Sequence, residues 1–371
     1  MYNSIKKVFS ENPENDLWRE LLTFSYDENV KKYLLQNGLS DDDEIINIIT
    51  GSFLQAYEYY KLAKESNLQI APLLLYYGST NLLNGMSVLM SGKKCEIKNH
   101  GMKIHPDNIS NIADTKISFL SVDSGGIHIF SKSFGFNFNL TEYGDWYLSE
   151  FLDSIAEIHD DYVNCYKNDV SKIIMLDVFN TQDGKVEKVY YTQDNEDQIK
   201  EQLCSVEGFD KSYLHPVPAK KHGSQEEYFV LRHKINGKDI SEISYSGQPY
   251  LRASHFKNSK KITIPTVINM YISLFVLASL CRYYPEKWSP FVQKDTTGEK
   301  LLIEKFLFFA RRIIPNIVLD YLLNKKMLYV SDKYQPTDTI KHVSEHEVKE
   351  LIKKEVAQQK ERDMLLNKSR I

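Results

Sequence analysis

The sequence has few cysteines and no motif that pairs them. Its four cysteines are dispersed along 371 residues, and none belongs to a CxxC pair. This pattern argues against a disulfide framework and is typical of a reducing compartment. The N-terminus also lacks the apolar core of a signal peptide. We therefore predict a cytoplasmic protein.

The chain also has little net charge. Lys and Arg number 46 against 50 Asp and Glu, which leaves a formal charge of -4. A protein whose whole surface contacts a nucleic-acid backbone would be strongly basic, although a local basic patch is compatible with this balance. Hydrophobic residues make up 42% of the chain and charged residues 26%, which excludes global disorder and indicates a large packed core.

Motifs for phosphate loops and metal sites are missing as well. Neither GxGxxG nor GxxxxGK[ST] occurs, so no cofactor is predicted. His342 and His346 have the spacing of metal ligands on a helix, but they do not form an HExxH motif and lie in a charged tail. No metal site is predicted.

What is present is one long apolar run, from Ile264 to Leu280. A helix that is apolar on every side must be buried in a core or a bilayer. The run has 17 residues, fewer than the roughly 20 that a bilayer requires, and it contains Asn269. The sequence therefore predicts a buried core helix and no membrane span.

Helical patterns flank a central region of different periodicity. Acidic residues at 41–44 predict a helix start, and Pro72 fits a helical first turn. Pro315 is expected to kink or split the helix that contains it. The expected helices lie within 14–92, including 41–65 and 70–86, and at 262–284, 299–329 and 342–368.

The central region predicts antiparallel hairpins. Three Gly-containing turns, at 123–126, 183–184 and 236–237, separate runs rich in β-branched and aromatic residues. An aromatic helix is expected over 146–162. The fold class is therefore α+β, with a helical core built from both ends of the chain. The expected parts are 1–92, the β-rich insertion 93–260, the buried helices 261–335 and the charged tail 336–371.

Two segments are candidates for binding. A basic and aromatic segment at 250–261 contains Arg252, His255 and Lys260. With the basic residues at 220–222 and 232–233, it can form a cationic surface for a nucleotide or nucleic acid, because phosphates need charge and bases stack on aromatic rings. An ordinary loop with solvated lysines is the alternative.

The second candidate is the end of the apolar helix. Arg282 either caps the helix as a structural clamp or binds a ligand in an aromatic pocket. The aromatic residues expected around it are Tyr283, Tyr284 and Trp288, and its expected neighbours on the helix at 70–86 are Tyr76, Tyr77 and Asn81.

A resemblance to a known family rests on segments 71–83 and 280–288, with Trp18, Tyr33-Leu34 and His100-Gly101. In these segments the chain resembles the bacterial YaaC-like family, which implies a cytoplasmic bacterial protein and no particular reaction. The helices also resemble those of HEPN-type proteins, many of which are ribonucleases of toxin and phage-defence systems.

The HEPN nucleases use an Arg followed by a His four to six residues later. No such pair occurs here, since Arg252 precedes His255 by three residues and Arg282 has no His nearby in the sequence. The chain therefore lacks, in its sequence, the Arg and His pair that the HEPN nucleases use for catalysis.

Two hypotheses for the function follow. The chain is a non-catalytic binding or regulatory protein that recognises a nucleotide or nucleic acid, or an RNA-directed, HEPN-like effector enzyme with antiviral activity. The charged helix at 342–368 is either a solvated helix or a contact for a protein partner. Whether the chain is an enzyme is left open, and so is its oligomeric state, with a dimer among the options.

Overall fold

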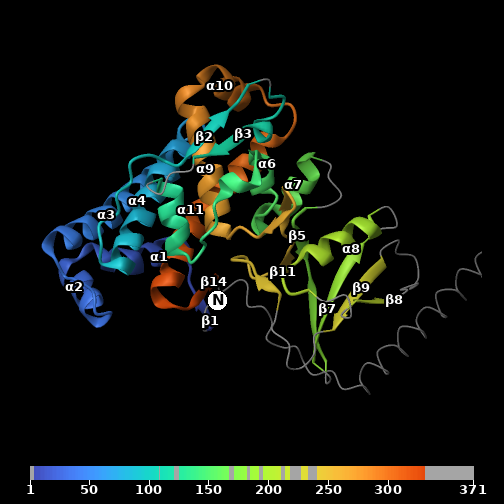
Figure 1. The fold of residues 1–371 in the computed structure, drawn as a ribbon, viewed down its shortest axis with the longest axis horizontal. Coiled ribbons are helices and arrows are strands. Elements are labelled where there is room, and N and C mark those ends of the chain that lie inside the picture. The colour runs from blue at the N-terminus through green and yellow to red at the C-terminus, as the bar shows by residue number, and fades with distance from the viewer. Residues whose placement is uncertain are drawn as a thin grey trace, which may run out of the picture.

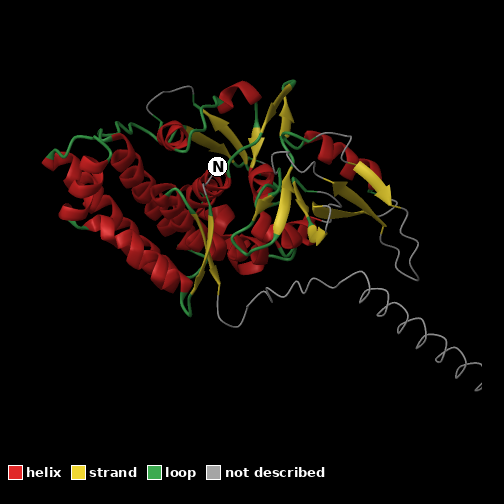
Figure 2. Cartoon of the chain, turned by 90° about the horizontal axis from the view of Figure 1, so that it is seen from below, coloured by secondary structure: helices red, strands yellow, loops and turns green. Residues whose placement is uncertain are grey.

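The computed structural model of the protein describes residues 4–107, 109–120, 125–166, 171–181, 184–191, 195–209, 214–217, 227–232 and 240–330. Helices gather at one end of the molecule, and a sheet with one helix lies at the other (Figure 1). The view from below shows that further short strands lie among the helices (Figure 2). The predicted α+β class is confirmed.

The helices of the described chain follow the predicted zones in most places. The α-helices are α1 (Pro13–Leu21), α2 (Asp27–Gln36), α3 (Asp43–Glu65), α4 (Ala71–Ser91), α5 (Gly126–Ser133), α6 (Leu148–Leu152), α7 (His159–Tyr166), α8 (Glu196–Ser205), α9 (Thr266–Tyr283), α10 (Pro285–Lys294) and α11 (Glu299–Leu323). Short 3₁₀ turns span Leu22–Ser25, Ile112–Asp114, Leu140–Tyr143 and Ala156–Ile158.

The described strands form five small sheets. They are β1 (Ile5–Phe9) with β14 (Lys326–Val330); β2 (Met102–His105), β3 (Lys116–Phe119) and β4 (Trp146–Tyr147); β10 (Glu242–Ile243), β11 (Pro249–Arg252) and β5 (Ile173–Met175); β6 (Asp177–Thr181), β7 (Gly184–Tyr191), β9 (Glu227–Arg232) and β8 (Leu214–Val217); and β12 (His255–Lys257) with β13 (Lys260–Ile262). Only the β1–β14 pair among these is parallel.

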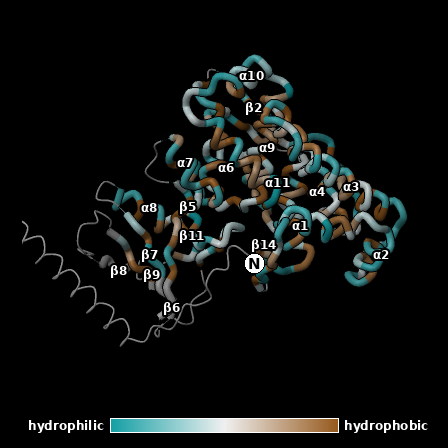
Figure 3. Tube along the Cα trace, turned by 180° about the vertical axis from the view of Figure 1, so that it is seen from behind, coloured by the Kyte–Doolittle hydropathy of each residue, from teal (hydrophilic) through white to brown (hydrophobic). Residues whose placement is uncertain are grey.

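Helix α9 is the centre of the helical part. Every residue from Val267 to Leu280 is buried, because α4, α5, α6, α10 and α11 all contact this helix. Hydrophobic residues are concentrated around it (Figure 3). Among the described residues it is the one helix long and apolar enough to cross a membrane, and 78% of that span is buried inside the protein. The predicted buried helix is confirmed.

The first long helices begin where the sequence predicts. The Asp42 carboxylate accepts a hydrogen bond from the Glu44 N–H at 2.8 Å and caps α3, and Pro72 lies in the first turn of α4. A side-chain cap satisfies an N–H that has no partner within the helix. The predicted start of α3 and the position of Pro72 are therefore confirmed.

The two ends of the described chain meet in a way that was not predicted. Strand β1 pairs in parallel with β14, in a stretch where the sequence predicted helix up to residue 329. On α11, the Asp320 carboxylate accepts the Met327 N–H at 2.8 Å, and the Asn316 amide donates to the Met327 carbonyl at 3.1 Å. These two side chains hold β14 in an extended conformation beside the helix.

Helix α11 continues through Pro315 from Glu299 to Leu323. Of the two predicted effects of this proline, a kink or a split, the split is therefore wrong, and the kink stays a prediction. Buried Ile314 and Ile317 flank the proline, and their burial in the core opposes a break there.

Of the three predicted hairpins, only the second is confirmed. Strands β6 and β7 pair antiparallel around positions 182–183, which lie outside the described residues. In the first, β3 instead pairs with β2 and β4, and Gly126–Ser133 is helix α5. In the third, β9 pairs with β7 and β8, while β10 pairs with β11.

The glycines of the first predicted turn serve a different purpose. A Cβ on Gly125 would lie 2.7 Å from the Gly101 Cα atom, so these residues allow two chain segments to approach closely. The expected aromatic helix is also wrong as a single element, because residues 146–162 form β4, α6, a 3₁₀ turn and the start of α7.

Most of the buried hydrophobic residues fall into two separate clusters. One large cluster joins residues from α1 through α7 with α9, α10, α11 and β14, whereas a smaller one holds β6, β7, β9 and α8 together. The predicted domain boundaries stay a prediction, and the tail at 336–371 lies outside the described residues.

The close packing of α3 against α4 gives a matched pair of glycine substitutions. A Cβ on Gly85 would lie 2.9 Å from the Ser52 Cβ, whereas a Cβ on Gly51 would meet no atom within 4 Å. We expect Gly85→Ala to lower the free energy of unfolding by about 1–3 kcal/mol through overpacking. Gly51→Ala should raise it by up to about 1 kcal/mol, because alanine favours helix. Urea unfolding measures both, and a stabilising Gly85→Ala would contradict this packing.

Candidate ligand-binding site around Arg282

The segments that carry Arg282, Tyr77 and His100 come together at the surface end of α9. Arg282 lies in the last turn of α9, Tyr77 lies on α4, and His100 lies in the loop before β2. Helices α4 and α9 pack against each other, which brings these residues together although they are far apart in sequence. We refer to Arg282, Tyr283, Tyr77, Tyr76 and His100 as the Arg282 cluster.

Arg282 is exposed, and its charge is not paired with a carboxylate anywhere in the described chain. Its Nη1 donates a hydrogen bond to the Tyr77 hydroxyl, and its guanidinium lies 4.9 Å from the centre of the Tyr283 ring. The Tyr77 ring in turn stacks on Tyr59, at 6.0 Å between ring centres. Aromatic rings therefore position the guanidinium and leave its charge available to an anion.

A chain of hydroxyl groups runs from the core to His100. The Tyr271 hydroxyl lies 3.2 Å from Thr80 Oγ1 and donates to the Tyr76 hydroxyl at 3.2 Å. The Tyr76 hydroxyl lies 2.6 Å from His100 Nδ1. Because Tyr76 accepts from Tyr271, its own proton is free to be donated to Nδ1. This arrangement favours the tautomer of His100 that carries its proton on Nε2.

The surroundings of His100 favour its neutral form. Partial burial and then the nearby Arg282 charge lower the pKa of the imidazole. Burial beside Tyr271 also raises the pKa of the Tyr76 hydroxyl, which keeps it protonated as a hydrogen-bond donor. His100 is therefore a neutral imidazole with an exposed edge, next to a cation.

The other residues predicted near Arg282 have different positions. Tyr284 is half-buried and ends α9, and its N–H donates to the Leu280 carbonyl. Asn81 is half-buried on α4, one turn after Tyr77. Trp288 is fully buried, so its ring cannot form the wall of an open binding site.

Trp288 instead fixes the junction between α9 and α10. Its Nε1 donates to the Gln69 carbonyl at 3.1 Å, and the Cys281 thiol donates to the same oxygen at 2.9 Å. The Gln69 amide donates to the Ser289 hydroxyl at 3.0 Å. Gln69, just before α4, thus fixes the end of the helix that presents Arg282.

Two residues of the predicted basic surface at 250–261, Arg252 and His255, lie in the interior of the protein. Arg252 is buried, and it donates hydrogen bonds to Glu242, to the Ser154 carbonyl and to the Thr266 hydroxyl. A buried guanidinium needs such partners, and the sequence alone does not reveal that β11 turns this residue inward. The other predicted basic residues, at 220–222 and 233, lie outside the described residues.

His255 and Lys260 are also engaged within the protein. His255 is buried, with Nε2 2.9 Å from the Ser154 hydroxyl and its ring against Trp146. Lys260 is exposed but forms an ion pair with Glu142. Both side chains therefore have structural partners within the protein. They do not form the cationic surface that was considered for this segment.

The structure contains no recognisable metal site in its described part. No three His, Cys, Asp or Glu side chains there are grouped so that they can hold a metal ion. His342 and His346 lie outside the described residues.

The sequence predictions identified Arg282 and Tyr77 but missed the role of His100. A search for a His four to six residues after an Arg cannot find a partner that comes from another part of the chain. Thr80 and Tyr271 were also missed, because a hydroxyl inside an apolar helix has no motif.

The environment of His255 predicts how stability depends on pH. Burial, together with the charges of Lys172, Lys257 and Arg252, lowers the pKa of His255 to about 3. The unfolded chain thus binds a proton at this position at pH 5 that the folded chain does not, so stability falls as the pH falls below the ordinary pKa of imidazole. In His255→Gln, the stability lost between pH 7 and pH 5 should be smaller by roughly 2 kcal/mol. Urea unfolding at both pH values measures this, and an equal loss in the two proteins would contradict the assignment.

Comparisons with known proteins add a family. The YaaC-like protein family model matches residues 24–322, a range that includes the whole Arg282 cluster. Neither the curated proteins nor the solved structures contain a significant match to the chain. Since the matched range covers most of the 371 residues, the chain belongs to the YaaC-like protein family.

Proposed function

We propose that the protein is a non-catalytic binding or regulatory protein of the bacterial cytoplasm that recognises a phosphate-bearing ligand, a nucleotide or nucleic acid, at the Arg282 cluster. The observation that carries this proposal is the exposed Arg282 guanidinium, which has aromatic neighbours and no carboxylate partner among the described residues.

The chemistry of the cluster suits such a ligand. A guanidinium binds a phosphate through two parallel N–H donors, and the bond is stronger than one between neutral groups. Tyr283 is 61% exposed, so a nucleobase can stack on the free part of its ring. His100, whose pKa is lowered by the Arg282 charge, can add a neutral donor through Nε2–H. Phosphate charge and a flat base are thus recognised by neighbouring groups.

Substitution of Arg282 tests this proposal. Purified protein is titrated with ATP, with GTP and with a short single-stranded RNA, by calorimetry. We expect binding of at least one of these, weakened about tenfold or more in Arg282→Ala, because a lost charge-assisted hydrogen bond costs about 1.5–3 kcal/mol. Arg19→Ala is the matched control, since Arg19 is an exposed arginine on α1 whose ion pair with Asp16, at 3.8 Å, is long.

The outcome that contradicts the proposal is clear. Failure of all three ligands to bind, or equal binding by wild type and Arg282→Ala, would exclude the Arg282 cluster as their site.

A second candidate function is RNA cleavage by a HEPN-like effector of a toxin or phage-defence system. The observation that favours it is the position of His100 near Arg282, close enough for the guanidinium charge to lower the imidazole pKa. An arginine can bind the scissile phosphate, and the imidazole can take up a proton if His100 adopts its other tautomer, which leaves Nε2 unprotonated. The two residues come from separate segments, unlike the single-helix motif of HEPN nucleases.

Cleavage assays separate the two candidates. If the protein is a nuclease, total RNA and tRNA should be cut by the wild type, and both His100→Ala and Arg282→Ala should reduce the rate by about a hundredfold or more, the usual contribution of a proton-transfer group. His105→Ala is the control, because His105 lies on β2, where its Nε2 lies 2.9 Å from the Ser118 hydroxyl. Tight RNA binding without turnover would exclude this second candidate.

Contacts with a protein partner through the helix predicted at 342–368, and the oligomeric state, stay predictions.

A further inference from the structure

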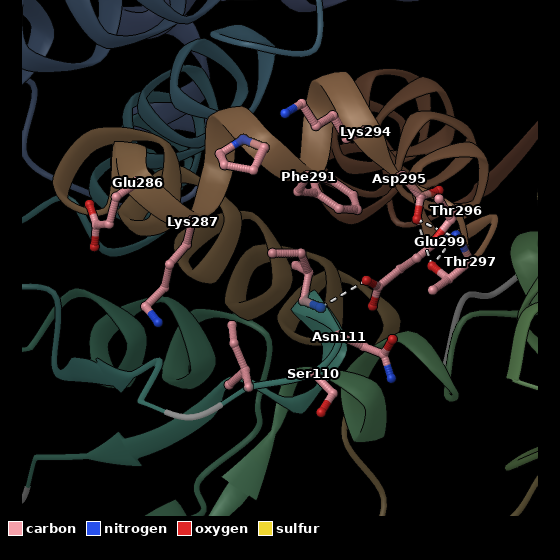
Figure 4. A pocket seen from close by; sticks show the side chains of 13 residues that line it. Ser110, Asn111, Glu286, Lys287, Phe291, Lys294, Asp295, Thr296, Thr297 and Glu299 are labelled. Atoms are coloured by element: carbon pink, nitrogen blue, oxygen red, sulfur yellow. Dashed lines mark hydrogen bonds between the residues drawn. The ribbon is translucent and has the colours of Figure 1, made fainter.

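A groove of about 320 Å³ lies between α10 and the turn at 109–112 (Figure 4). It shares no lining residue with the Arg282 cluster. Pro290 and Phe291 of α10 form one wall, and Ile109 and Ile112 form the opposite wall. Its volume is at the lower end of the range for small-molecule sites, so it suits a ligand with a single ring system.

Two of the acidic side chains at the groove are already occupied by donors of the protein. Glu299, which is 2% exposed, accepts the N–H groups of Ile112 and Ala113 at 2.8 and 2.7 Å, and the Tyr166 hydroxyl at 2.6 Å. Burial raises the pKa of Glu299, whereas these hydrogen bonds favour its carboxylate form. This carboxyl group therefore connects α11 to the 109–112 turn and is not available to a ligand.

Asp295 is occupied in the same way. Its carboxylate accepts the N–H groups of Thr297, Gly298 and Lys300 at 2.9 to 3.1 Å, together with the Thr297 hydroxyl. These are the donors at the start of α11, so the helix start is capped by the protein itself. An external anion is therefore not expected at the helix start.

Unlike these two carboxylates, two basic side chains of α10 have no partner among the described residues. Lys287 and Lys294 line the groove, and the side chain of neither forms an ion pair or a hydrogen bond with any described residue. Figure 4 shows the Lys287 side chain extending out from α10, to the left of the labelled Ser110 and Asn111. The oxygens of Glu299 and Asp295 are taken up by internal donors, so the side chains that remain to pair with a ligand are the ammonium groups of Lys287 and Lys294 and the carboxylate of Glu286.

Phe291 supplies a flat apolar surface beside Lys287. Its ring lies between α10 and the turn (Figure 4), and its other side packs on the buried Trp288, at 5.2 Å between ring centres. A ring held in this way can stack on a planar ligand without rearrangement. Lys287 is one turn of α10 before Phe291, so a cation and an aromatic ring lie on the same face of the helix.

We infer that this groove is a second binding site, for a small molecule with one planar ring and one carboxylate or phosphate group. The ring packs against Phe291 and Pro290, and the acidic group pairs with the Lys287 ammonium. The site is independent of the function proposed for the Arg282 cluster.

The test uses phenyl phosphate and benzoate as probes and follows their binding to the full chain by ligand-observed NMR titration. We expect at least one of the two to bind, and Lys287→Ala to weaken that binding about tenfold, as for one lost ion pair between the probe and the protein. Phe291→Leu, which keeps an apolar side chain without a ring, should weaken it as well. The control Lys32→Ala, an exposed lysine on α2, should bind like the wild type.

Further comparisons decide between the explanations. Thermal unfolding of each variant checks that it is folded, and Lys287→Ala alters a side chain outside the buried core. Binding that persists in Arg282→Ala supports a separate groove site, whereas loss in that variant would assign the probe to the Arg282 cluster and overturn the inference. Absence of binding by both probes, equally strong binding of inorganic phosphate, or binding unchanged in Lys287→Ala would also overturn it.

Discussion

The structure depends on the complete burial of helix α9. Fourteen successive residues, Val267 to Leu280, have no exposed face, so the surrounding helices must cover every side of the cylinder. Burial of a large aliphatic or aromatic side chain contributes about 1.5–3 kcal/mol, which makes this helix a principal source of stability. After Leu280 the last turn of α9 reaches solvent, with Arg282 and Tyr283 exposed. At this turn the Gln69 carbonyl accepts hydrogen bonds from Cys281 and Trp288. The position of Arg282 follows from this constraint.

The same constraint explains which features the sequence predicted well. An apolar run of 17 residues is too short for a bilayer and favours a buried helix, and acidic or proline residues at helix starts act through local chemistry, so α3, α4 and α9 were predicted correctly. The hairpins depend on which strands meet, and that is decided by packing of distant segments. Gly125 and Gly126 have the composition of a turn, yet Gly125 is needed for its close approach to Gly101, and Gly126 begins a helix.

The candidate site was predicted in part for a related reason. Arg282 and its tyrosines lie on two helices whose contact was expected, so their proximity follows from the fold. Arg252 and His255 belong to the same basic segment as Lys260, but β11 and β12 turn both inward, where Glu242 and Ser154 satisfy them. Alternation along a strand distinguishes inner from outer side chains only once its register is known. His100, by contrast, was not predicted as a site residue, because it belongs to no motif. The loop before β2 nevertheless places it near Arg282.

The central claim is that α9 and the loop before β2 bring the Arg282 charge close to the imidazole of His100. An NMR titration of the His100 ring in the wild type and in Arg282→Gln measures this directly, because a neighbouring positive charge disfavours the protonated imidazole. The structure predicts a His100 pKa below that of an ordinary histidine in the wild type, and a higher pKa in Arg282→Gln. The same pKa in both proteins would show that the two side chains do not interact and would contradict the account.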